Sequence, residues 1–297
     1  MRLVTYQAEA GPRAGLVVED RIVDVAEAAG LPSRMLDLIA LGEEGLQRLR
    51  ELERSAKGTG RPLQGTRLLA PIPRPAKNVF CLGLNYQAHI DESRGQRGAG
   101  MPGEGAPQRP EWPTYFSKAP TAVIGPEATI PLHANVTQRL DWEVELGLII
   151  GPGDVNIPVE HAYDHIFGYT IINDVSARDV QRRHGQQWFK GKSLDGSCPM
   201  GPWIVTHDEL GRADNLRLEC RVNGVVKQRS QTSLLIFTIP EIISGLSAGL
   251  TLEAGDVIAT GTPDGVGAAR NPPEFLKAGD VVECEIEGIG VLRNTVG

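Results

Sequence analysis

The segment DWEVELGLII, residues 141–150, alternates three carboxylates with apolar residues and then becomes wholly apolar. Side chains point alternately to the two faces of a strand, so Asp141, Glu143 and Glu145 are expected on one face and the residues between them in a core. Carboxylates a few Å apart resist joint ionisation unless a cation compensates, which favours a divalent metal ion with oxygen ligands. The alternative is a solvated outer strand face, which antiparallel sheets also present.

The composition indicates a globular protein that binds small molecules. The chain has 297 residues, of which 41% are hydrophobic and 23% charged, and its 35 Gly and 21 Pro predict many turns between short strands. The net charge of -7 argues against a nucleic-acid partner or an anionic membrane surface. We therefore expect a small-molecule substrate, with no nucleic acid and no membrane as partner.

The cysteines and the N-terminal segment predict a cytoplasmic location. The cysteines at positions 81, 198, 220 and 284 show no CxxC or zinc-ribbon spacing, which favours reduced, mostly buried residues. The first residues lack the apolar core of a signal peptide, and no stretch approaches the roughly 18 apolar residues of a membrane span.

Two domains are expected. Residues 1–72 form a small β-rich domain that includes one or two helices over residues 33–55. The proline-rich segment 68–75 marks the boundary, and residues 73–297 form the larger domain. Its strands are not regularly followed by helices, which disfavours a doubly wound sheet. The predicted class is α+β, mostly β, with a mixed β-sandwich or roll.

The larger domain is expected to contain many short strands and few helices. Strands are expected at residues 78–84, 121–124, 144–150, 167–173, 203–206, 217–222, 257–260 and 281–286, and helices near residues 157–162, 177–183 and 238–248. The Gly- and Pro-rich insertion 94–113 is not expected to be regular structure and is a candidate for a mobile lid.

The segment GLNYQAHIDES, residues 83–93, contains an acid/base candidate. His89 and Glu92 are three residues apart on one face of a short helix, so the carboxylate can orient the imidazole and make it a stronger base. The alternative is an ordinary surface pair, which is worth a few tenths of a kcal/mol.

The segment INDVSARDVQ, residues 172–181, ends an apolar strand with Asp174. A carboxylate at a strand end is well placed to bind a ligand, because the scaffold is rigid while the side chain meets a cleft. Alternatively, Asp174 or Ser176 caps the helix that follows.

Two glycine-containing segments offer polar groups for a substrate. Lys192 lies in FKGKSLDGS, which is not a phosphate-binding loop because Gln186 stands where that motif requires glycine, so we interpret the lysine as a partner for a substrate anion. In ATGTPDGVG, backbone amides such as that of Gly261 and the hydroxyl of Thr262 could hold a carboxylate or a developing oxyanion. An ordinary β-turn is the competing interpretation.

Taken in order over residues 75–295, these segments resemble the fumarylacetoacetate hydrolase family. The matching pieces are GLNYQAHIDES, DWEVELGLIIG, NDVSARDVQ, GKSLDGSCPMGPW, the segment 222–224, TSLLIFTIPEIISGLS and ATGTPDGVG. The resemblance implies a mixed β-roll of the family's C-terminal type, usually in a homodimer. It also implies a Mg2+ or Mn2+ ion and action on 2-oxo acids, by hydrolysis or another cleavage of C–C bonds.

The resemblance also implies roles for individual residues. The metal ligands are Glu143, Glu145 and Asp174, the base dyad is His89 with Glu92, the substrate contacts are Gln181, Lys192, Gly261 and Thr262, and Asp141 supports the ligands without binding the metal. Lys192 would in addition stabilise the charge of an enolate as it develops.

The expected reaction is hydrolysis of an acylpyruvate, a 2,4-dioxo acid such as fumarylpyruvate, to pyruvate and a second acid, as in aromatic catabolism. The base dyad would activate water, and the oxo-acid end would chelate the metal. Decarboxylation, isomerisation or hydration of an oxo acid is the alternative, because all these reactions share an enolate. A non-catalytic oxo-acid-binding protein is also considered, although binding alone requires no base.

Overall fold

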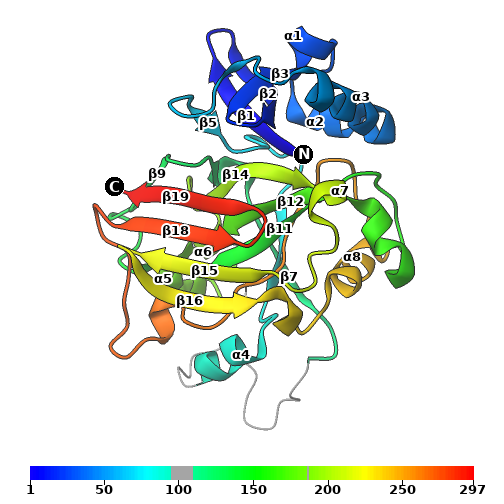
Figure 1. Cartoon of the computed structure of the whole chain (residues 1–297). Helices are drawn as coiled ribbons and strands as arrows, with labels where there is room; N and C mark the ends of the chain where they lie inside the picture. Colours follow the sequence, from blue (N-terminus) through cyan, green and yellow to red (C-terminus); the bar gives the residue numbers. More distant parts are fainter. Residues whose placement is uncertain (95–109, 186) are drawn as a thin grey trace.

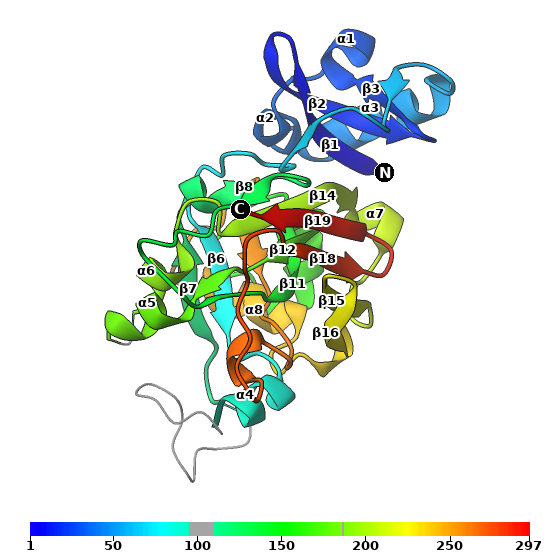
Figure 2. The same cartoon turned by 90° about the vertical axis from the view of Figure 1, so that its left-hand side faces the viewer.

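The computed structural model describes residues 1–94, 110–185 and 187–297. Figures 1 and 2 show a small N-terminal unit seated on a larger body, in which one sheet lies behind another. Strands predominate over helices, and the sheets are open and mixed. The predicted class, α+β and mostly β, is confirmed.

The N-terminal unit is an antiparallel sheet with helices packed beside it. Its elements are β1 (Arg2–Ala8), β2 (Gly11–Val18), β3 (Arg21–Asp24), α1 (Val25–Ala29), α2 (Met35–Ile39), α3 (Gly42–Ser55), β4 (Arg61–Pro62) and β5 (Leu68–Leu69). The helical segment is divided at Gly42, whose φ of 56° is a left-handed conformation that glycine adopts at little cost. Strand β1 pairs with β14 (Cys198–Thr206), so this sheet continues into the larger body. The domain boundary at residue 72 stays a prediction.

The large sheet crosses the body in the order β14, β12, β11, β17, β6 and β7. These further strands are β12 (Ile166–Asn173), β11 (Val144–Ile150), β17 (Val257–Ala259), β6 (Val79–Gly83) and β7 (Thr114–Lys118). Every residue of β11 and β12 is buried, as expected of strands that are covered on both faces. Their antiparallel register pairs Val144 with Asn173, so the start of one strand lies beside the end of the other.

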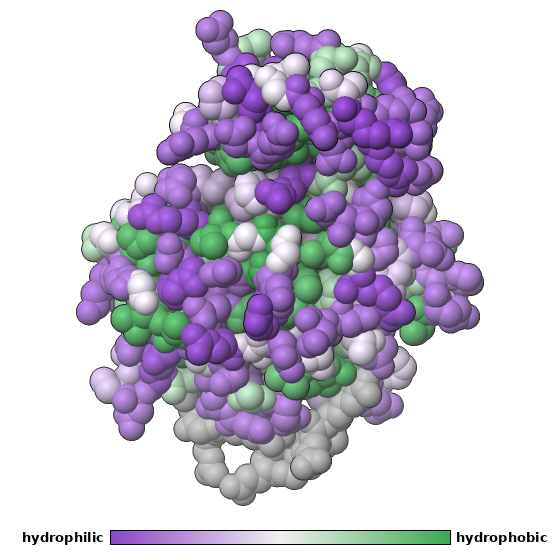
Figure 3. Space-filling view, viewed as in Figure 1, coloured by the Kyte–Doolittle hydropathy of each residue, from purple (hydrophilic) through white to green (hydrophobic). Residues whose placement is uncertain are grey.

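A second sheet lies in front of the first in Figure 1. Its order is β16 (Val225–Gln231), β15 (Arg217–Val222), β18 (Val281–Ile286), β19 (Gly290–Val296) and β9 (Thr129–Ile130). Buried residues alternate with more exposed ones along β15 and β18, so one face of this sheet packs inward. Figure 3 shows the face viewed in Figure 1 as a mixture of hydrophilic and hydrophobic side chains, and the expected homodimer stays a prediction.

Short elements complete the fold. They are β8 (Val123–Ile124), β10 (Leu140–Asp141), β13 (Ser176–Ala177), α4 (Gln87–Arg94), α5 (Arg178–Arg183), α6 (Phe189–Lys192), α7 (His207–Leu210), α8 (Ile239–Ser247), and the 3-10 turns η1 (Pro120–Ala122), η2 (Val159–His165), η3 (Thr232–Leu234) and η4 (Gly267–Ala269). Helix α8 begins with a capping box formed by Thr238 and Glu241, which satisfies backbone amides at the helix start.

Two large hydrophobic clusters hold the described residues together. One lies between the two sheets and includes Trp142 and Leu146 from the acidic segment and Val282 from the second sheet. The other joins Ile149, on the far face of the large sheet, to Leu49 of the N-terminal unit. Burying one aliphatic side chain stabilises the fold by roughly 1.5–3 kcal/mol. The acidic segment contributes side chains to both clusters, so it is anchored on both faces of the large sheet.

Some expected elements differ from the structure. Residues 157–162 were expected to be helical, but the 3-10 turn η2 begins only after Pro158. Strands β7, β16 and β19 were not anticipated, because their polar residues mask the alternation that reveals a half-buried strand. The insertion considered as a lid falls largely on residues 95–109, outside the described residues.

Two further sequence expectations concern burial and hydropathy. The cysteines at positions 81, 198, 220 and 284 are all free and buried, which confirms their predicted burial. Within the part of the chain that the structure describes, no helix combines the length and the apolar character needed to cross a membrane.

Candidate functional site

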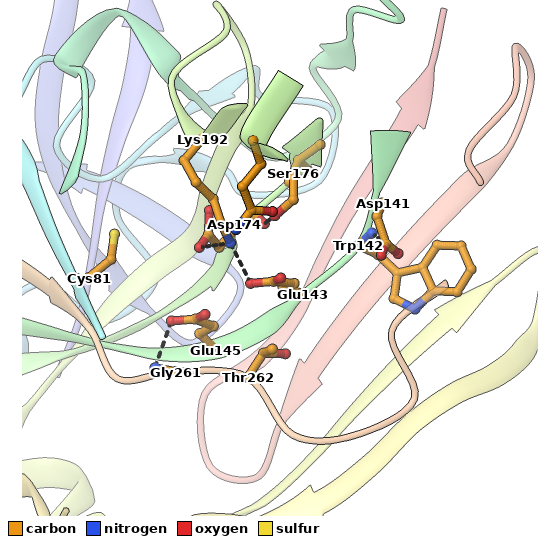
Figure 4. A network of polar contacts seen from close by, with 12 residues as sticks. Cys81, Asp141, Trp142, Glu143, Glu145, Asp174, Ser176, Lys192, Gly261 and Thr262 are labelled. Carbon is orange, nitrogen blue, oxygen red and sulfur yellow. Dashed lines mark hydrogen bonds and ion pairs between the residues drawn. The ribbon is translucent and has the colours of Figure 1, made fainter. Parts of the chain in front are cut away.

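Three acidic side chains meet where β11 begins and β12 ends. Glu143 and Glu145 flank Val144, the first residue of β11, and Asp174 directly follows β12. The Asp174 amide donates a hydrogen bond to the Glu143 carbonyl at 2.8 Å, which fixes the two segments side by side. One carboxylate oxygen from each of the three acids lies within 4.8 Å of the others, and all three residues are buried (Figure 4). The solvated strand face is therefore excluded, and so is a helix cap at Asp174, since α5 has no side-chain cap.

Asp141 lies apart from this cluster (Figure 4). Its Oδ1 accepts a hydrogen bond from the Gly267 amide at 2.7 Å, and its Oδ2 accepts from the Ala268 amide at 3.0 Å and from Arg178 Nε at 2.8 Å. Strand β10 ends at Asp141 and β11 begins at Val144, so the acidic segment is not one continuous strand. The expectation that Asp141 shares a strand face with the other two acids is wrong.

Two buried lysines contact two of the three acids in the cluster. Lys192 Nζ lies 2.8 Å from Glu143 Oε2 and 2.7 Å from Asp174 Oδ2. Lys118 Nζ lies 2.7 Å from Asp174 Oδ1 and 3.1 Å from the Val175 carbonyl, and it also donates to the Lys192 carbonyl. Lys192, predicted to meet a substrate anion, thus already contacts two of the candidate metal ligands.

Glu145 has a different kind of partner from Glu143 and Asp174. Arg178 Nη2 lies 2.6 Å from Glu143 Oε1, so Glu143 has two cationic neighbours, as does Asp174. Glu145 Oε2 accepts a hydrogen bond from the Gly261 amide at 2.8 Å. Among the residues that the structure describes, no cation pairs with Glu145.

The pKa shifts follow from this arrangement. Burial acts to raise the pKa of Glu143, but the charges of Lys192 and Arg178 outweigh it and hold the pKa well below its usual value. Burial and the nearby charges of Asp174 and Glu143 raise the pKa of Glu145 well above its usual value. Burial acts to lower the pKa of Lys192, yet Asp174 and Glu143 raise it to about 12, so its ammonium group persists at neutral pH.

These residues fit a divalent metal ion. Three carboxylates supply hard oxygen donors, which Mg2+ and Mn2+ prefer to nitrogen or sulfur. Among the described residues, no protein cation pairs with Glu145, and a bound metal ion would provide the missing positive charge. Lys192 and Lys118 would remain as neighbours that hold Asp174 in place.

The candidate base dyad, His89 with Glu92, lies on helix α4. His89 Nδ1 is 2.7 Å from Glu92 Oε1, and Glu92 Oε2 accepts a hydrogen bond from the Gly265 amide at 2.8 Å. The two side chains are only 10% and 18% exposed, so this is not an ordinary surface pair. When Nδ1–H donates to the carboxylate, the lone pair of Nε2 is left to accept a proton. The amides of Gly265 and Gly261 belong to one turn and hold Glu92 and Glu145, so the dyad lies near the acidic cluster.

The remaining predicted substrate contacts make internal hydrogen bonds. The Thr262 hydroxyl donates to the Val144 carbonyl at 3.0 Å and accepts from Gln228 Nε2 at 2.8 Å, and the Gly261 amide is directed at Glu145. Gln181 Oε1 accepts from Arg178 Nη1 at 3.4 Å. The roles predicted for Gln181, Gly261 and Thr262 in substrate binding stay predictions.

Besides Arg178, which lies beside Glu143, sequence reasoning missed three other buried polar residues. These are Lys118, Gln228, whose Oε1 accepts from the Val144 amide at 3.0 Å, and Tyr86, whose hydroxyl has no partner among the described residues. Burial and the charge of Glu145 raise the pKa of Tyr86, so its hydroxyl keeps its proton. Tyr86 belongs to the same segment as His89, whereas neither Lys118 nor Gln228 lies in a segment that suggested a site.

Known proteins resemble this chain in sequence and in structure. The model of the fumarylacetoacetate (FAA) hydrolase C-terminal family matches residues 78–297. The oxaloacetate tautomerase YisK of Bacillus subtilis (strain 168) is 41% identical over 298 residues, which cover 95% of each chain.

Two solved structures are also similar over the whole chain. The fumarylacetoacetate hydrolase from psychrophilic Exiguobacterium antarcticum is 40% identical with a TM-score of 0.84, and the match covers 100% of this chain and 99% of that one. The maleylpyruvate hydrolase from Sphingobium sp. SYK-6, in complex with manganese(II) and pyruvate, is 29% identical with a TM-score of 0.77, and the match covers 100% and 98% of the two chains.

Proposed function

Because this chain belongs to the fumarylacetoacetate hydrolase family, we propose that it is a metal-dependent enzyme that interconverts the keto and enol forms of oxaloacetate. The observation that carries this proposal is a partly buried base dyad beside three carboxylates, one of which has no cationic partner among the described residues. The tautomerase from Bacillus subtilis supports the choice of reaction.

Glu143, Glu145 and Asp174 would hold the metal ion. The chemistry that Mg2+ or Mn2+ supplies in such a site is Lewis-acid polarisation of the keto oxygen, which acidifies the protons on the adjacent carbon. Lys192 keeps its proton, because its pKa is raised to about 12, and its ammonium group offsets the negative charge that develops on that oxygen.

His89 is the residue that moves the proton. Its Nε2 lone pair takes a proton from C3 of oxaloacetate as the C2–C3 double bond forms and the C2 oxygen gains the electron pair. Glu92 stabilises the imidazolium at Nδ1, and returning the proton to the C2 oxygen gives the enol and restores the neutral imidazole. No C–C bond breaks in this reaction.

The second candidate is hydrolysis of an acylpyruvate, the reaction that the sequence favours. It needs the same base to activate water, and the similar maleylpyruvate hydrolase from Sphingobium favours it. A protein that only binds oxo acids would need no base such as the His89–Glu92 pair. Decarboxylation and hydration would use the same enolate, but no particular contact favours either.

Exchange of the C3 protons of oxaloacetate in D2O with Mg2+, followed by NMR, tests the proposal. We expect exchange well above that with Mg2+ alone, and its loss in His89→Gln. His161→Gln is the matched control, because His161 makes an exposed pair with Asp164 at the same spacing. If the wild type accelerates nothing but releases pyruvate from maleylpyruvate, the tautomerase proposal fails and the hydrolase takes its place.

A further inference from the structure

Strand β7 contacts Lys192 at two places. Phe116 and Lys118 are two residues apart on this strand, so their side chains project from the same face. Lys118 donates a hydrogen bond to the backbone carbonyl of Lys192, and Lys192 Nζ lies 5.0 Å from the centre of the Phe116 ring. One strand therefore holds the backbone of Lys192 and also presents an aromatic ring to its ammonium group.

The contact between Phe116 and Lys192 is a cation–π interaction. An ammonium group within about 6 Å of a ring centre is attracted to the ring face, and more strongly where water is excluded. Lys192 is only 2% exposed. Among the described residues its Nζ donates to Glu143 and Asp174 (Figure 4), so one of its three N–H groups is left for an oxygen of a bound ligand.

Trp188 packs against the same phenylalanine. The rings of Phe116 and Trp188 meet edge to face, with centres 5.4 Å apart and planes at 64°. The Lys192 amide donates to the Trp188 carbonyl at 3.1 Å, so these two residues are one helical turn apart. Phe116 therefore contacts both ends of one turn, the indole of Trp188 and the ammonium group of Lys192.

Gly83 leaves the space that the Trp188 indole fills. A Cβ atom at Gly83 would lie 2.8 Å from Cη2 of Trp188 and closer still to Cζ3. Gly83 does not have a positive φ, so contact with the ring, and not the backbone conformation, requires glycine here. Gly83 ends β6 and begins the segment that carries His89. The indole thus packs between the turn of Lys192 and the chain that leads to the base.

We propose that Phe116 is a positioning residue for Lys192 and that Trp188 holds the Phe116 ring in place. The inference rests on the proposed function, in which the ammonium group of Lys192 offsets the negative charge that develops on the bound oxo acid. A misplacement of such a group by about 1 Å can cost about 10²-fold in rate. Phe116 acts through Lys192 and does not itself need to touch the substrate.

Phe116→Leu and Phe116→Tyr test the role of the ring, because leucine is apolar without an aromatic face and tyrosine keeps the face. The measurements are C3 proton exchange at saturating oxaloacetate and the oxalate affinity of the Mg2+-loaded protein by calorimetry. We expect Phe116→Leu to lower both by about tenfold and Phe116→Tyr to keep both within about twofold of the wild type. Phe189→Leu is the control and should behave as the wild type, since Phe189 is next to Trp188 in sequence but 43% exposed.

Gly83→Ala tests the part played by Trp188, because the added methyl group would displace the indole. We expect this change to weaken oxalate binding severalfold in the wild type, but to have no further effect in Trp188→Leu, where the methyl group has room. The effects of the two substitutions would then be non-additive. A loss from Gly83→Ala that is as large in Trp188→Leu as in the wild type would overturn the role of Trp188.

The outcomes separate this inference from the proposed function. Wild-type oxalate affinity in Phe116→Leu would overturn the inference, and so would equal losses in Phe116→Leu and Phe116→Tyr, because the aromatic face would then not matter. If the wild type binds oxalate but accelerates no exchange, the proposed function fails. A loss of oxalate affinity in Phe116→Leu that Phe116→Tyr does not show would still support the inference in that case.

Discussion

Lys118 and Asp174 form an ion pair with no exposed surface, in which Lys118 Nζ lies 2.7 Å from Asp174 Oδ1. The lysine ends strand β7 and the aspartate follows β12, so the pair ties two strands that are not neighbours in the large sheet. Lys192 Nζ takes the other oxygen of the same carboxylate at 2.7 Å. Asp174 is therefore held in a fixed orientation by protein groups alone.

Replacing Lys118 with methionine should destabilise the protein by about 3–5 kcal/mol, because it leaves the buried Asp174 carboxylate with one fewer cation. Urea unfolding measures this free energy. Lys190→Met, at an exposed position of α6, is the control and should change stability little. A Lys118→Met variant as stable as the wild type would show that Asp174 does not depend on this pair.

Glu145→Gln should abolish stabilisation by metal while leaving the metal-free protein at least as stable as the wild type. Burial and two neighbouring carboxylates raise the pKa of Glu145, so an uncharged amide relieves repulsion but removes a ligand. Thermal unfolding with and without MnCl2 measures both effects, since a ligand at 100 times its Kd adds about 2.7 kcal/mol. Glu44→Gln, at an exposed position of α3, should respond to metal as the wild type does. A full metal response in Glu145→Gln would remove Glu145 from the ligand set.

His89→Gln should lower turnover by about 10² to 10⁴-fold, the usual contribution of a general base, and should keep oxalate binding. The turnover of Glu92→Gln should lie between that of His89→Gln and that of the wild type. An amide oxygen can still accept a hydrogen bond from Nδ1–H of His89, but it no longer stabilises the imidazolium. Steady-state kinetics and oxalate calorimetry separate the two effects. If His89→Gln kept turnover but lost oxalate affinity, His89 would be a substrate-binding residue.

Asp141→Asn should cost about 1.5–3 kcal/mol of stability, the range for hydrogen bonds to a charged group. The carboxylate accepts from two backbone amides and from Arg178, whereas the NH2 group of asparagine would oppose one set of these donors. Differential scanning calorimetry measures the change, with Asp20→Asn in an exposed turn as the control. Unchanged stability would mean that Asp141 does not hold the turn.

The choice between tautomerisation and hydrolysis could not be made from the residues alone. Both reactions use a base, a cluster of metal-binding carboxylates and a cation for the enolate oxygen, so the same motif predicts both. The sequence favours hydrolysis through its resemblance to the hydrolase family, whereas the similar protein from Bacillus subtilis is an oxaloacetate tautomerase.

Local spacing determined the features that depend on one segment of chain. The alternation of Glu143 and Glu145 predicted a common strand face, and the three-residue spacing of His89 and Glu92 predicted a helical pair, because strand and helix periods fix which neighbours share a face. Only the tertiary structure decided that Asp174 joins the two glutamates, since that depends on the register of β11 against β12. It likewise decided that Asp141 turns away and that Lys118 enters the cluster. Contacts between distant segments follow from the packing of whole sheets, which no local pattern encodes.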